Sequence, residues 1–363
     1  MPQRLDCELD PGPVAPGESR MMTRPASRPI GRTGLRISEL GFGAAPLGNL
    51  YANISDEVAH AALVTALDAG VTYVDTAPYY GFGLSERRVG DVLRKRSDVV
   101  VSTKVGRLLV PAVSLSTDRH GFVSDMPFAP LFDYSYDGVM RSWEHSLHRL
   151  GLARIDILYV HDIGRLTHGE RHSHTCHDLT AGGGLRALEE LRADGQIRAF
   201  GVGVNEIEIC MELMEASSLD VILLAGRYTL LEQSALDLFL PACEARNISV
   251  VVGGPYNSGI LATGVQGNAP RRYNYEAAPD AVVEKVRRIE AVCERHGVTL
   301  AAAALQFPLA HPQVAAVIPG LDGPLQVSRA FEQYDANIPS DFWSELRTQG
   351  LLLQDAPTPA PTA

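Results

Sequence analysis

Four polar residues in this sequence each follow directly on a short apolar or β-branched run. Asp75, Lys104, His161 and Asn205 end the runs Thr-Tyr-Val, Val-Val-Val-Ser-Thr, Ile-Asp-Ile-Leu-Tyr-Val and Ala-Phe-Gly-Val-Gly-Val. One apolar strand that ends in a polar residue is unremarkable. Four such strands along one chain predict a shared site, because the carboxyl ends of parallel strands meet at one edge of a sheet.

A tyrosine lies close in sequence to the first of these strand ends. Tyr80 comes five positions after Asp75, on a loop that contains Pro78, Gly81 and Gly83. A free tyrosine has a pKa of about 10, so only on the order of 0.1% is ionised at pH 7. A neighbouring ammonium favours the phenolate and lowers that pKa by roughly 1–3 units. A phenol and an amine are thus residue types that proton transfer to or from a substrate oxygen requires.

The strands that carry these residues alternate with segments of helical periodicity. Eight runs of strand length are expected, around residues 41–43, 72–75, 98–104, 155–161, 199–205, 221–225, 248–253 and 314–318. This order predicts an α/β fold, a (β/α)8 (TIM) barrel with helices outside a closed parallel sheet. The alternative, an open doubly wound sheet, favours a GxGxxG turn after the first strand. The sequence GFGAAPLG lacks that spacing, which favours the barrel.

The stretch Val74–Gly90, VDTAPYYGFGLSERRVG, closely resembles the signature of the aldo-keto reductases. The resemblance covers about residues 28–340. It implies a (β/α)8 barrel with long active-site loops and an N-terminal β-hairpin that plugs the bottom of the barrel. A hairpin pattern with Gly34 at its turn is present at Pro29–Leu40.

The same resemblance implies a catalytic role for each of four residues. Tyr80 is the acid or base, and Lys104 is the cation that lowers its pKa. Asp75 holds Lys104 charged and oriented, and His161 donates a hydrogen bond that orients the substrate oxygen. Each residue alone has an ordinary structural explanation, whereas the set of four favours catalysis.

The resemblance also implies a nicotinamide cofactor, NAD or NADP. Its binding positions are Asn205, Gly254, Pro255, Ser258, Gly259, Gly320, Gln326 and Arg329. Many relatives bind the 2′-phosphate of NADP with a Lys-Ser pair and an arginine, where this chain has Gly320, Leu321 and Gln326. The loss of these contacts favours NAD over NADP, with Arg329 as a partial compensation.

The nicotinamide end departs from the common family pattern. Asn205 matches the residue that holds the nicotinamide amide, but it follows Val204 instead of a serine. The aromatic residue that usually stacks under the nicotinamide falls at Gly253 or Gly254, and Tyr256 is the nearby candidate for that role.

Composition narrows the class of partner. The formal net charge is −11, which argues against nucleic acid or an anionic membrane surface as the main partner. No apolar run approaches the roughly 18 residues that span a bilayer. The five cysteines form no CxxC motif, and the acidic, proline-rich N-terminus lacks a signal-peptide pattern. We expect a cytoplasmic protein that acts on a small molecule as a monomer or small homo-oligomer.

The chain is expected to contain one domain with two loosely structured ends. Residues 1–27 read as a disordered extension, residues 28–350 as the barrel and residues 351–363 as a flexible tail.

Two long segments are expected to carry substrate specificity. Gly106–Tyr136 shows no clear helical or strand period, and its aromatic residues either pack on one another or form a lid over the substrate. Gly164–Gly184 reads as a polar loop that contains His168, His172, His174, Cys176 and His177. Because these residues lack a standard ligand spacing, no metal is expected, although stoichiometric zinc in the purified protein would reverse that.

Within the family, the sequence looks most similar to the sugar 1-dehydrogenases, the D-threo-aldose and L-fucose dehydrogenases. The features that carry this likeness are LGFGAAPLGN, STKVGRLL, YVHD, GVGVN and AAALQFPLAHPQVAAVIPG. The implied reaction oxidises the C1 hydroxyl of an aldose to a lactone, with Tyr80 as the base. The alternatives are a pyridoxal 4-dehydrogenase, a general aldehyde or ketone reductase, and a non-catalytic nucleotide-binding regulatory subunit.

Overall fold

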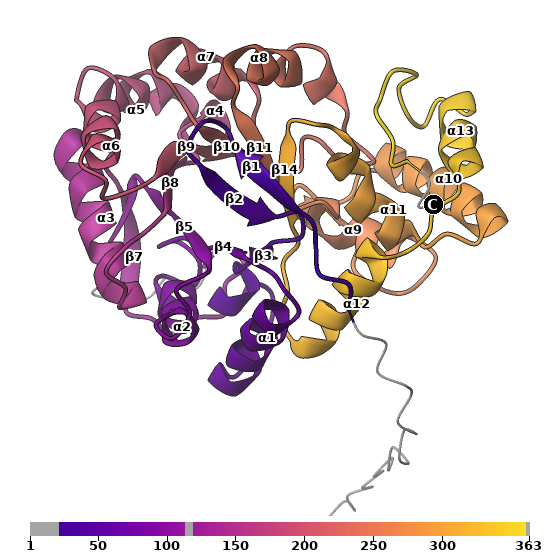
Figure 1. Ribbon diagram of the computed structural model, residues 1–363, viewed down its shortest axis with the longest axis horizontal. Helices are drawn as coiled ribbons and strands as arrows, with labels where there is room; N and C mark the ends of the chain where they lie inside the picture. The colour runs from indigo at the N-terminus through magenta and orange to yellow at the C-terminus, as the bar shows by residue number, and fades with distance from the viewer. Residues whose placement is uncertain (1–21, 113–118, 361–363) are drawn as a thin grey trace, which may run out of the picture.

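The computed structural model describes residues 22–112 and 119–360, and its centre is an eight-stranded parallel sheet (Figure 1). In spatial order the strands are β14 (Val314–Ile318), β11 (Ser249–Gly253), β10 (Val221–Ala225), β9 (Ala199–Val204), β8 (Ile157–His161), β5 (Val100–Val105), β4 (Tyr73–Asp75) and β3 (Phe42–Gly43). Parallel bridges from Leu40 to Val317 and from Gly43 to Gly320 join the two edges. The predicted (β/α)8 barrel is therefore confirmed.

Helices surround the sheet on all sides (Figure 1). They are α1 (Asp56–Asp68), α2 (Leu84–Leu93), α3 (Tyr136–Leu150), α6 (Gly184–Ala193), α7 (Glu208–Ala216), α8 (Phe239–Arg246), α10 (Asp280–His296), α11 (Leu300–Gln306), α12 (Pro324–Tyr334) and α13 (Ser340–Thr348). The first begins after Ser55, whose side chain accepts a hydrogen bond from the Val58 amide as an N-cap.

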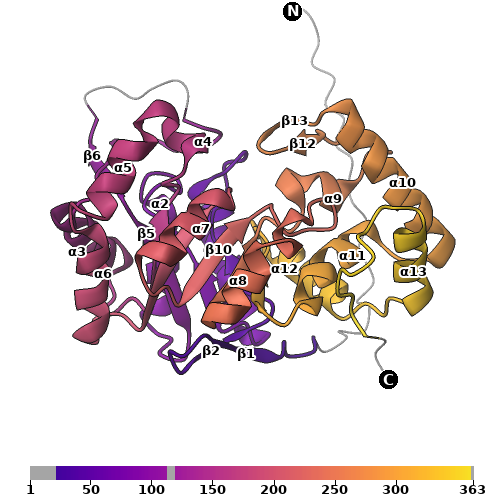
Figure 2. The same ribbon diagram turned by 90° about the horizontal axis from the view of Figure 1, so that it is seen from above.

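A hairpin closes the N-terminal end of the barrel, as the family resemblance implies. It consists of β1 (Ser27–Ile30) and β2 (Leu35–Ser38), paired antiparallel. Ile30, Leu35 and Ile37 belong to the same buried apolar cluster as Tyr73 and Ile157 of the barrel interior. Figures 1 and 2 show the hairpin lying across one end of the barrel. The opposite end, at the carboxyl ends of the strands, is not covered by this hairpin, and the candidate active site lies there.

The first long segment at that opposite end is more regular than the sequence suggests. Gly106–Tyr136 contains an antiparallel pair, β6 (Arg107–Pro111) and β7 (Phe128–Phe132). The expectation of a segment without regular structure was wrong there. The sequence of β7 shows no alternation of apolar and polar residues, because this strand is half-buried along most of its length and contains a proline. Residues 113–118 of this segment lie outside the described residues.

The second long segment, Gly164–Gly184, was also expected to be a loop and is mostly helical. It contains α4 (Arg165–His168), a 3₁₀ turn (Gly169–Arg171) and α5 (His172–Leu179). A third insertion, the short hairpin β12 (Arg272–Tyr273) and β13 (Glu276–Ala277), follows the short helix α9 (Ile260–Thr263). These insertions lie toward the end of the barrel that is opposite β1 and β2 (Figure 2).

The described part of the C-terminal tail packs on the barrel. Leu351, Leu352 and Ala356 are buried, and the Leu353 amide donates to the side chain of Gln233. Composition predicted a flexible tail over residues 351–363. Its first residues are apolar, however, and they pack on the barrel ahead of the proline-rich end. The remaining tail residues 361–363 and residues 1–21 of the expected N-terminal extension lie outside the described residues.

Four of the five cysteines fall within the described residues, and all four are free thiols. They are Cys176, Cys210, Cys243 and Cys293. None of the helices in residues 22–112 and 119–360 combines the length and apolar character that a membrane-spanning helix needs.

Candidate active site

The Asp75 carboxylate and the Lys104 ammonium form a buried ion pair at the ends of β4 and β5. Lys104 Nζ donates to Asp75 Oδ2 at 2.6 Å and to the Thr76 carbonyl oxygen at 2.9 Å. The two side chains are only 1% and 2% exposed. The Lys104 Nζ atom also lies 4.6 Å from the centre of the Tyr80 ring. The structure thus brings together three of the four residues that the sequence predicts.

The strand register explains how this pair is positioned. Asp75 is aligned with Ser102 of β5, and Lys104 lies two residues further along the same strand. Residues two apart on a strand point to the same face. The Ser102 hydroxyl donates to Asp75 Oδ1 at 2.7 Å and lies 2.9 Å from the Tyr73 hydroxyl. Each oxygen of the Asp75 carboxylate therefore accepts a hydrogen bond, one from Lys104 and one from Ser102. Ser102 is a positioning residue that the sequence analysis missed.

Tyr80 is held over this pair by a close contact between two loops. A Cβ added to Gly81 would lie 2.4 Å from the carbonyl oxygen of Gly48, so the backbones of the two loops are too close for any residue other than glycine at position 81. Gly81 also has a φ of 64°, which glycine adopts at low cost. This packing fixes the loop that follows Asp75 and places the Tyr80 ring above Lys104.

The pKa of Tyr80 differs in direction from the sequence-based expectation. Burial raises the pKa of Tyr80 well above its usual value, and the nearby carboxylates Asp75 and Asp162 raise it further. Arg107 lowers this pKa, but by less than the raising effects together. Although part of the ring lines the cavities, protein atoms desolvate the phenol, and Asp75 neutralises the Lys104 charge. The net shift of the Tyr80 pKa in this state is therefore upward, opposite to the expected direction, and Tyr80 is a neutral phenol.

His161, at the end of β8, completes the predicted set of four. Its ring centre lies 6.0 Å from that of Tyr80 in an edge-to-face arrangement. Burial lowers the pKa of His161 well below its usual value, and the cations Arg107 and Lys104 lower it further. The imidazole is therefore neutral at pH 7, with one N–H to donate, and its Nδ1 atom is buried without a partner among the described residues.

An ion pair that the sequence analysis missed flanks His161. The Arg107 guanidinium bonds to the Asp162 carboxylate and stacks 4.2 Å from the centre of the Tyr79 ring. Asp162 Oδ2 lies 3.5 Å from Nε2 of His161. Asp162 adopts this place through a left-handed backbone turn, with φ 44°, directly after β8. Both residues lie within stretches quoted for the family likeness, STKVGRLL and YVHD, but the sequence alone does not show that they pair.

These side chains line a cavity of about 580 Å³ at the mouth of the barrel. Tyr80, Lys104 and His161 are part of its wall, together with Arg107 and Asp162. Further aromatic side chains come from neighbouring loops, namely Tyr51, Tyr79, His120, Phe122 and Tyr275. The wall of the cavity thus combines hydrogen-bonding groups with aromatic rings.

A second cavity of about 570 Å³ adjoins the first and shares Tyr80 and Asn205 with it. All eight residues predicted to bind the cofactor line this groove: Asn205, Gly254, Pro255, Ser258, Gly259, Gly320, Gln326 and Arg329. Asn257 and Ser258 have φ values of 44° and 60°, so consecutive residues turn in the left-handed region beside the groove. A Cβ at Gly259 would meet nothing within 4 Å, which leaves room for a phosphate group to approach the backbone.

The nicotinamide end of the groove contains a tyrosine that the sequence analysis did not assign. Tyr275, from the turn between β12 and β13, lines both cavities, and its side chain hydrogen-bonds to that of Asn205. Tyr256, the predicted aromatic substitute, also lines the groove but donates its hydroxyl to Gln333 at 2.5 Å. Both are therefore candidates for the contact that Gly253 cannot make.

At the other end of the groove an aspartate stands beside the predicted adenosine-binding residues. Asp322 lines the groove together with Gln326 and Arg329. Its Oδ1 atom is buried and has no hydrogen-bond partner among the described residues. A carboxylate in this place is suited to a ribose hydroxyl and repels a phosphate. The residues of the groove therefore fit a dinucleotide along its full length.

Comparisons with known proteins agree with this geometry. The sequence profile of the Aldo/keto reductase family matches residues 39–349. The chain belongs to the aldo/keto reductase family. It is therefore an oxidoreductase, and the family's cofactor is a nicotinamide dinucleotide, which the residues of the groove fit.

Two curated relatives of this aldo/keto reductase cover nearly the whole chain. Pyridoxal 4-dehydrogenase from Microbacterium luteolum is 44% identical over 335 residues, which are 90% of this chain and 97% of the relative. D-threo-aldose 1-dehydrogenase from a Pseudomonas species is 41% identical over 333 residues, with the same coverage of 90% and 97%. Among solved structures, an aldo-keto reductase from Bacillus halodurans matches with a TM-score of 0.69 and 24% identity. That match covers 90% of this chain and 95% of the solved chain, and it shows the fold alone.

Proposed function

We propose that this aldo/keto reductase is an NAD-dependent dehydrogenase that oxidises the C1 hydroxyl of an aldose to a lactone. The observation that carries the proposal is the buried Asp75–Lys104 pair beneath Tyr80, at the boundary between the two cavities. The relative that acts on D-threo-aldoses supports the substrate class.

Each side chain of the site has a separate role in this reaction. When bound in the groove, the nicotinamide would accept the hydride from the substrate carbon. The hydroxyl proton passes to Tyr80 Oη, which must first be deprotonated. Lys104, fixed by Asp75, stabilises the resulting negative charge, and His161 donates its N–H to the substrate oxygen. Arg107 and Asp162 stand where further hydroxyl groups of a sugar would contact the wall.

Pyridoxal is the second candidate substrate, and a specific observation favours it. The relative that is 44% identical is named for this reaction. Pyridoxal carries an aldehyde next to a hydroxymethyl group, so it closes to a cyclic hemiacetal, like an aldose in its ring form. Oxidation of either hemiacetal carbon gives a lactone. The stacked rings of Tyr80 and Phe122, whose centres are 6.2 Å apart, offer a flat surface to either ring.

The test is a screen for substrate-dependent reduction of NAD with purified protein. The substrates are L-fucose, D-arabinose, L-galactose, pyridoxal and simple alcohols, and each product is examined for a lactone. Turnover of a cyclic hemiacetal supports the proposal, with the aldoses and pyridoxal distinguished by kcat/KM. NADPH-dependent turnover of simple carbonyls alone would make the protein a general reductase. Nucleotide binding without turnover of any substrate would make it a regulatory subunit.

The preference for NAD is expected to depend on Asp322. The wild type should show a higher kcat/KM with NAD than with NADP, because the Asp322 carboxylate repels a 2′-phosphate. Among the described residues that line the groove, Arg329 is the one arginine that could offset this repulsion. The double variant Asp322→Asn/Gln326→Arg should shift the ratio toward NADP by about 100-fold, since a repulsive charge is replaced by an attractive one.

The matched control for this shift is Asp341→Asn, which removes an exposed carboxylate in the first turn of α13. It should leave the ratio unchanged. An advantage of tenfold or more for NADP in the wild type would refute the preference.

A further inference from the structure

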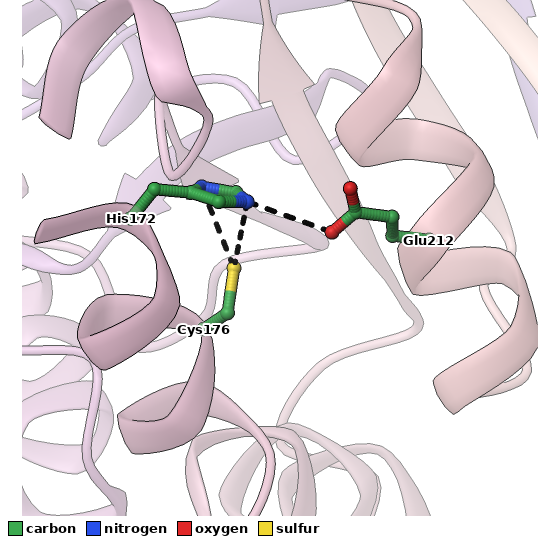
Figure 3. Close-up of side chains that lie close together, drawn as sticks. All are labelled: His172, Cys176 and Glu212. Carbon is green, nitrogen blue, oxygen red and sulfur yellow. Dashed lines mark hydrogen bonds and ion pairs between the residues drawn. The ribbon is translucent and has the colours of Figure 1, made fainter. Parts of the chain in front are cut away.

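Three side chains from two helices face one another (Figure 3), and none of them lines either of the two cavities. His172 and Cys176 lie one turn apart on α5, and Glu212 faces them from α7. His172 Nε2 is 3.6 Å from Cys176 Sγ and 3.5 Å from Glu212 Oε2. All three ligand atoms lie within 4.8 Å of one another.

These distances approach those of a tetrahedral zinc site. Zn–S bonds of about 2.3 Å and Zn–N bonds of about 2.0 Å at a tetrahedral angle put the sulfur and nitrogen about 3.5 Å apart. The nitrogen and oxygen ligands would be about 3.3 Å apart by the same geometry. Closing the site requires side-chain rotations: the Cys176 sulfur would move away from Nδ1 toward the lone pair of Nε2, and the 51% exposed Glu212 side chain would move toward both atoms.

The histidine is held in an orientation that suits a metal ligand. His172 is buried, and its Nδ1 atom lies 3.2 Å from the carbonyl oxygen of Ile163. Donation from Nδ1 to this carbonyl fixes the tautomer and leaves the Nε2 lone pair for a cation. The Cys176 sulfur is equally close to both ring nitrogens, at 3.6 Å. Nδ1 is engaged by the carbonyl, so Nε2 is the atom through which the imidazole would bind.

The surrounding charges also favour a cation. Glu206 and Glu212 both face Cys176, while Arg165 is the cation that faces it. Two other histidines of this segment have other partners. His168 Nε2 lies 2.9 Å from the Tyr134 hydroxyl, and exposed His174 pairs with Asp178 on its own helix.

We propose that His172, Cys176 and Glu212 bind one zinc ion, with water as the fourth ligand. Nitrogen, thiolate and carboxylate are the ligand types that zinc accepts, and three protein ligands plus water are a common set. The site clamps α5 to α7, and through the His172–Ile163 contact it steadies the loop that follows His161. The proposal reverses the sequence-based expectation of no metal. That expectation rested on spacing within one segment, whereas Glu212 comes from another helix.

The test uses the full chain without an affinity tag, loaded with Zn²⁺ or with Co²⁺ as a spectroscopic probe. One Zn²⁺ per chain is expected in elemental analysis, and Co²⁺ should show a sulfur-to-metal charge-transfer band. Saturating Zn²⁺ should raise the Tm by about 3 °C, as for a ligand at 100 times its Kd. Hydrogen exchange over residues 163–179 should slow on loading.

Two ligand variants and one matched control decide the outcome. Cys176→Ser and Glu212→Ala should each weaken Zn²⁺ binding by at least tenfold and so reduce the Tm shift to about half or less at the same Zn²⁺ concentration. His174→Gln, on the same helix but exposed, should bind as the wild type does. If Co²⁺ gives no charge-transfer band, or if Glu212→Ala binds Zn²⁺ as tightly as the wild type, the proposal is overturned. Glu212→Ala removes a half-exposed side chain, so it keeps the test decisive even if Cys176→Ser fails to fold.

Discussion

Replacing Tyr80 by phenylalanine is expected to lower kcat for alcohol oxidation by about 10²–10⁴-fold, the range for loss of a general acid or base. The change removes only the hydroxyl oxygen, so the ring can keep its stacking with Phe122 and its place above Lys104. KM and the Kd of the nicotinamide cofactor should change little. Steady-state kinetics and fluorescence titration of the cofactor provide these values.

Tyr136→Phe is the matched control for this variant. The Tyr136 hydroxyl donates to Glu190 on the exposed surface between α3 and α6, outside both cavities. Its removal should leave kcat within about twofold, as for surface substitutions in general. A Tyr80→Phe variant with kcat close to that of the wild type would exclude the phenol as the acid or base.

The raised pKa of Tyr80 gives the same variant a second readout. Oxidation needs the phenolate, whose fraction rises about tenfold for each pH unit below the pKa. Reduction needs the neutral phenol, which is already the main form at neutral pH. In the wild type, kcat/KM for oxidation should therefore increase toward alkaline pH, whereas that for reduction should be flat and then decline. Both dependences should be absent from the residual activity of Tyr80→Phe. A flat oxidation profile in the wild type would contradict the role of Tyr80 as the base.

The sequence was sufficient for those parts of the site that depend on a local pattern. Strand ends could be read from apolar runs, so Asp75, Lys104 and His161 were placed correctly at the barrel mouth. Contacts between residues far apart in the sequence, such as the Arg107–Asp162 ion pair, could not be predicted, because only the folded chain brings the two side chains together. The predicted direction of the Tyr80 pKa shift was wrong for a related reason. The sequence showed the cation, but neither the burial of the phenol nor the second carboxylate at Asp162.

The missed helix α5 shows how a polar segment conceals its periodicity. Its buried positions are His172, Thr175 and Leu179, which have the spacing of one helix face. Two of these three side chains are polar, so hydrophobicity alone does not reveal that face. The histidine and the threonine satisfy their polar atoms locally: the His172 ring lies at the Ile163 carbonyl, and the Thr175 hydroxyl donates to the His172 carbonyl at 2.9 Å.

The second large effect is expected at the Asp75–Lys104 pair, and stability and activity should respond differently. Lys104→Met removes the cation from a pocket in which the carboxylate is only 2% exposed. The loss of one partner of a buried ion pair typically costs about 3–5 kcal/mol. Burial already raises the pKa of Asp75 despite the lysine beside it. Without Lys104 the carboxylate therefore becomes protonated at a higher pH, which limits the cost. Activity should decrease by about 10²-fold or more, because the charge that stabilises the phenolate is lost.

The double variant Asp75→Asn/Lys104→Met separates these two effects. It leaves no isolated charge in the pocket, and Ser102 can still donate to the amide oxygen in the place of Asp75 Oδ1. We expect it to recover at least half of the stability lost in Lys104→Met, measured by urea unfolding. It should recover none of the activity, because the cation is still absent. Lys95→Met, which removes an exposed lysine after α2, should match the wild type in both assays.

The comparison of these variants tests whether the ammonium acts on the chemistry or only on the fold. If Lys104 merely holds the barrel mouth together, activity should return with stability in the double variant. If it also lets the phenol ionise to the phenolate that takes the substrate proton, the double variant should be stable and inactive. The remaining activity of both variants should then require higher pH than that of the wild type, because a phenol without a neighbouring cation ionises later.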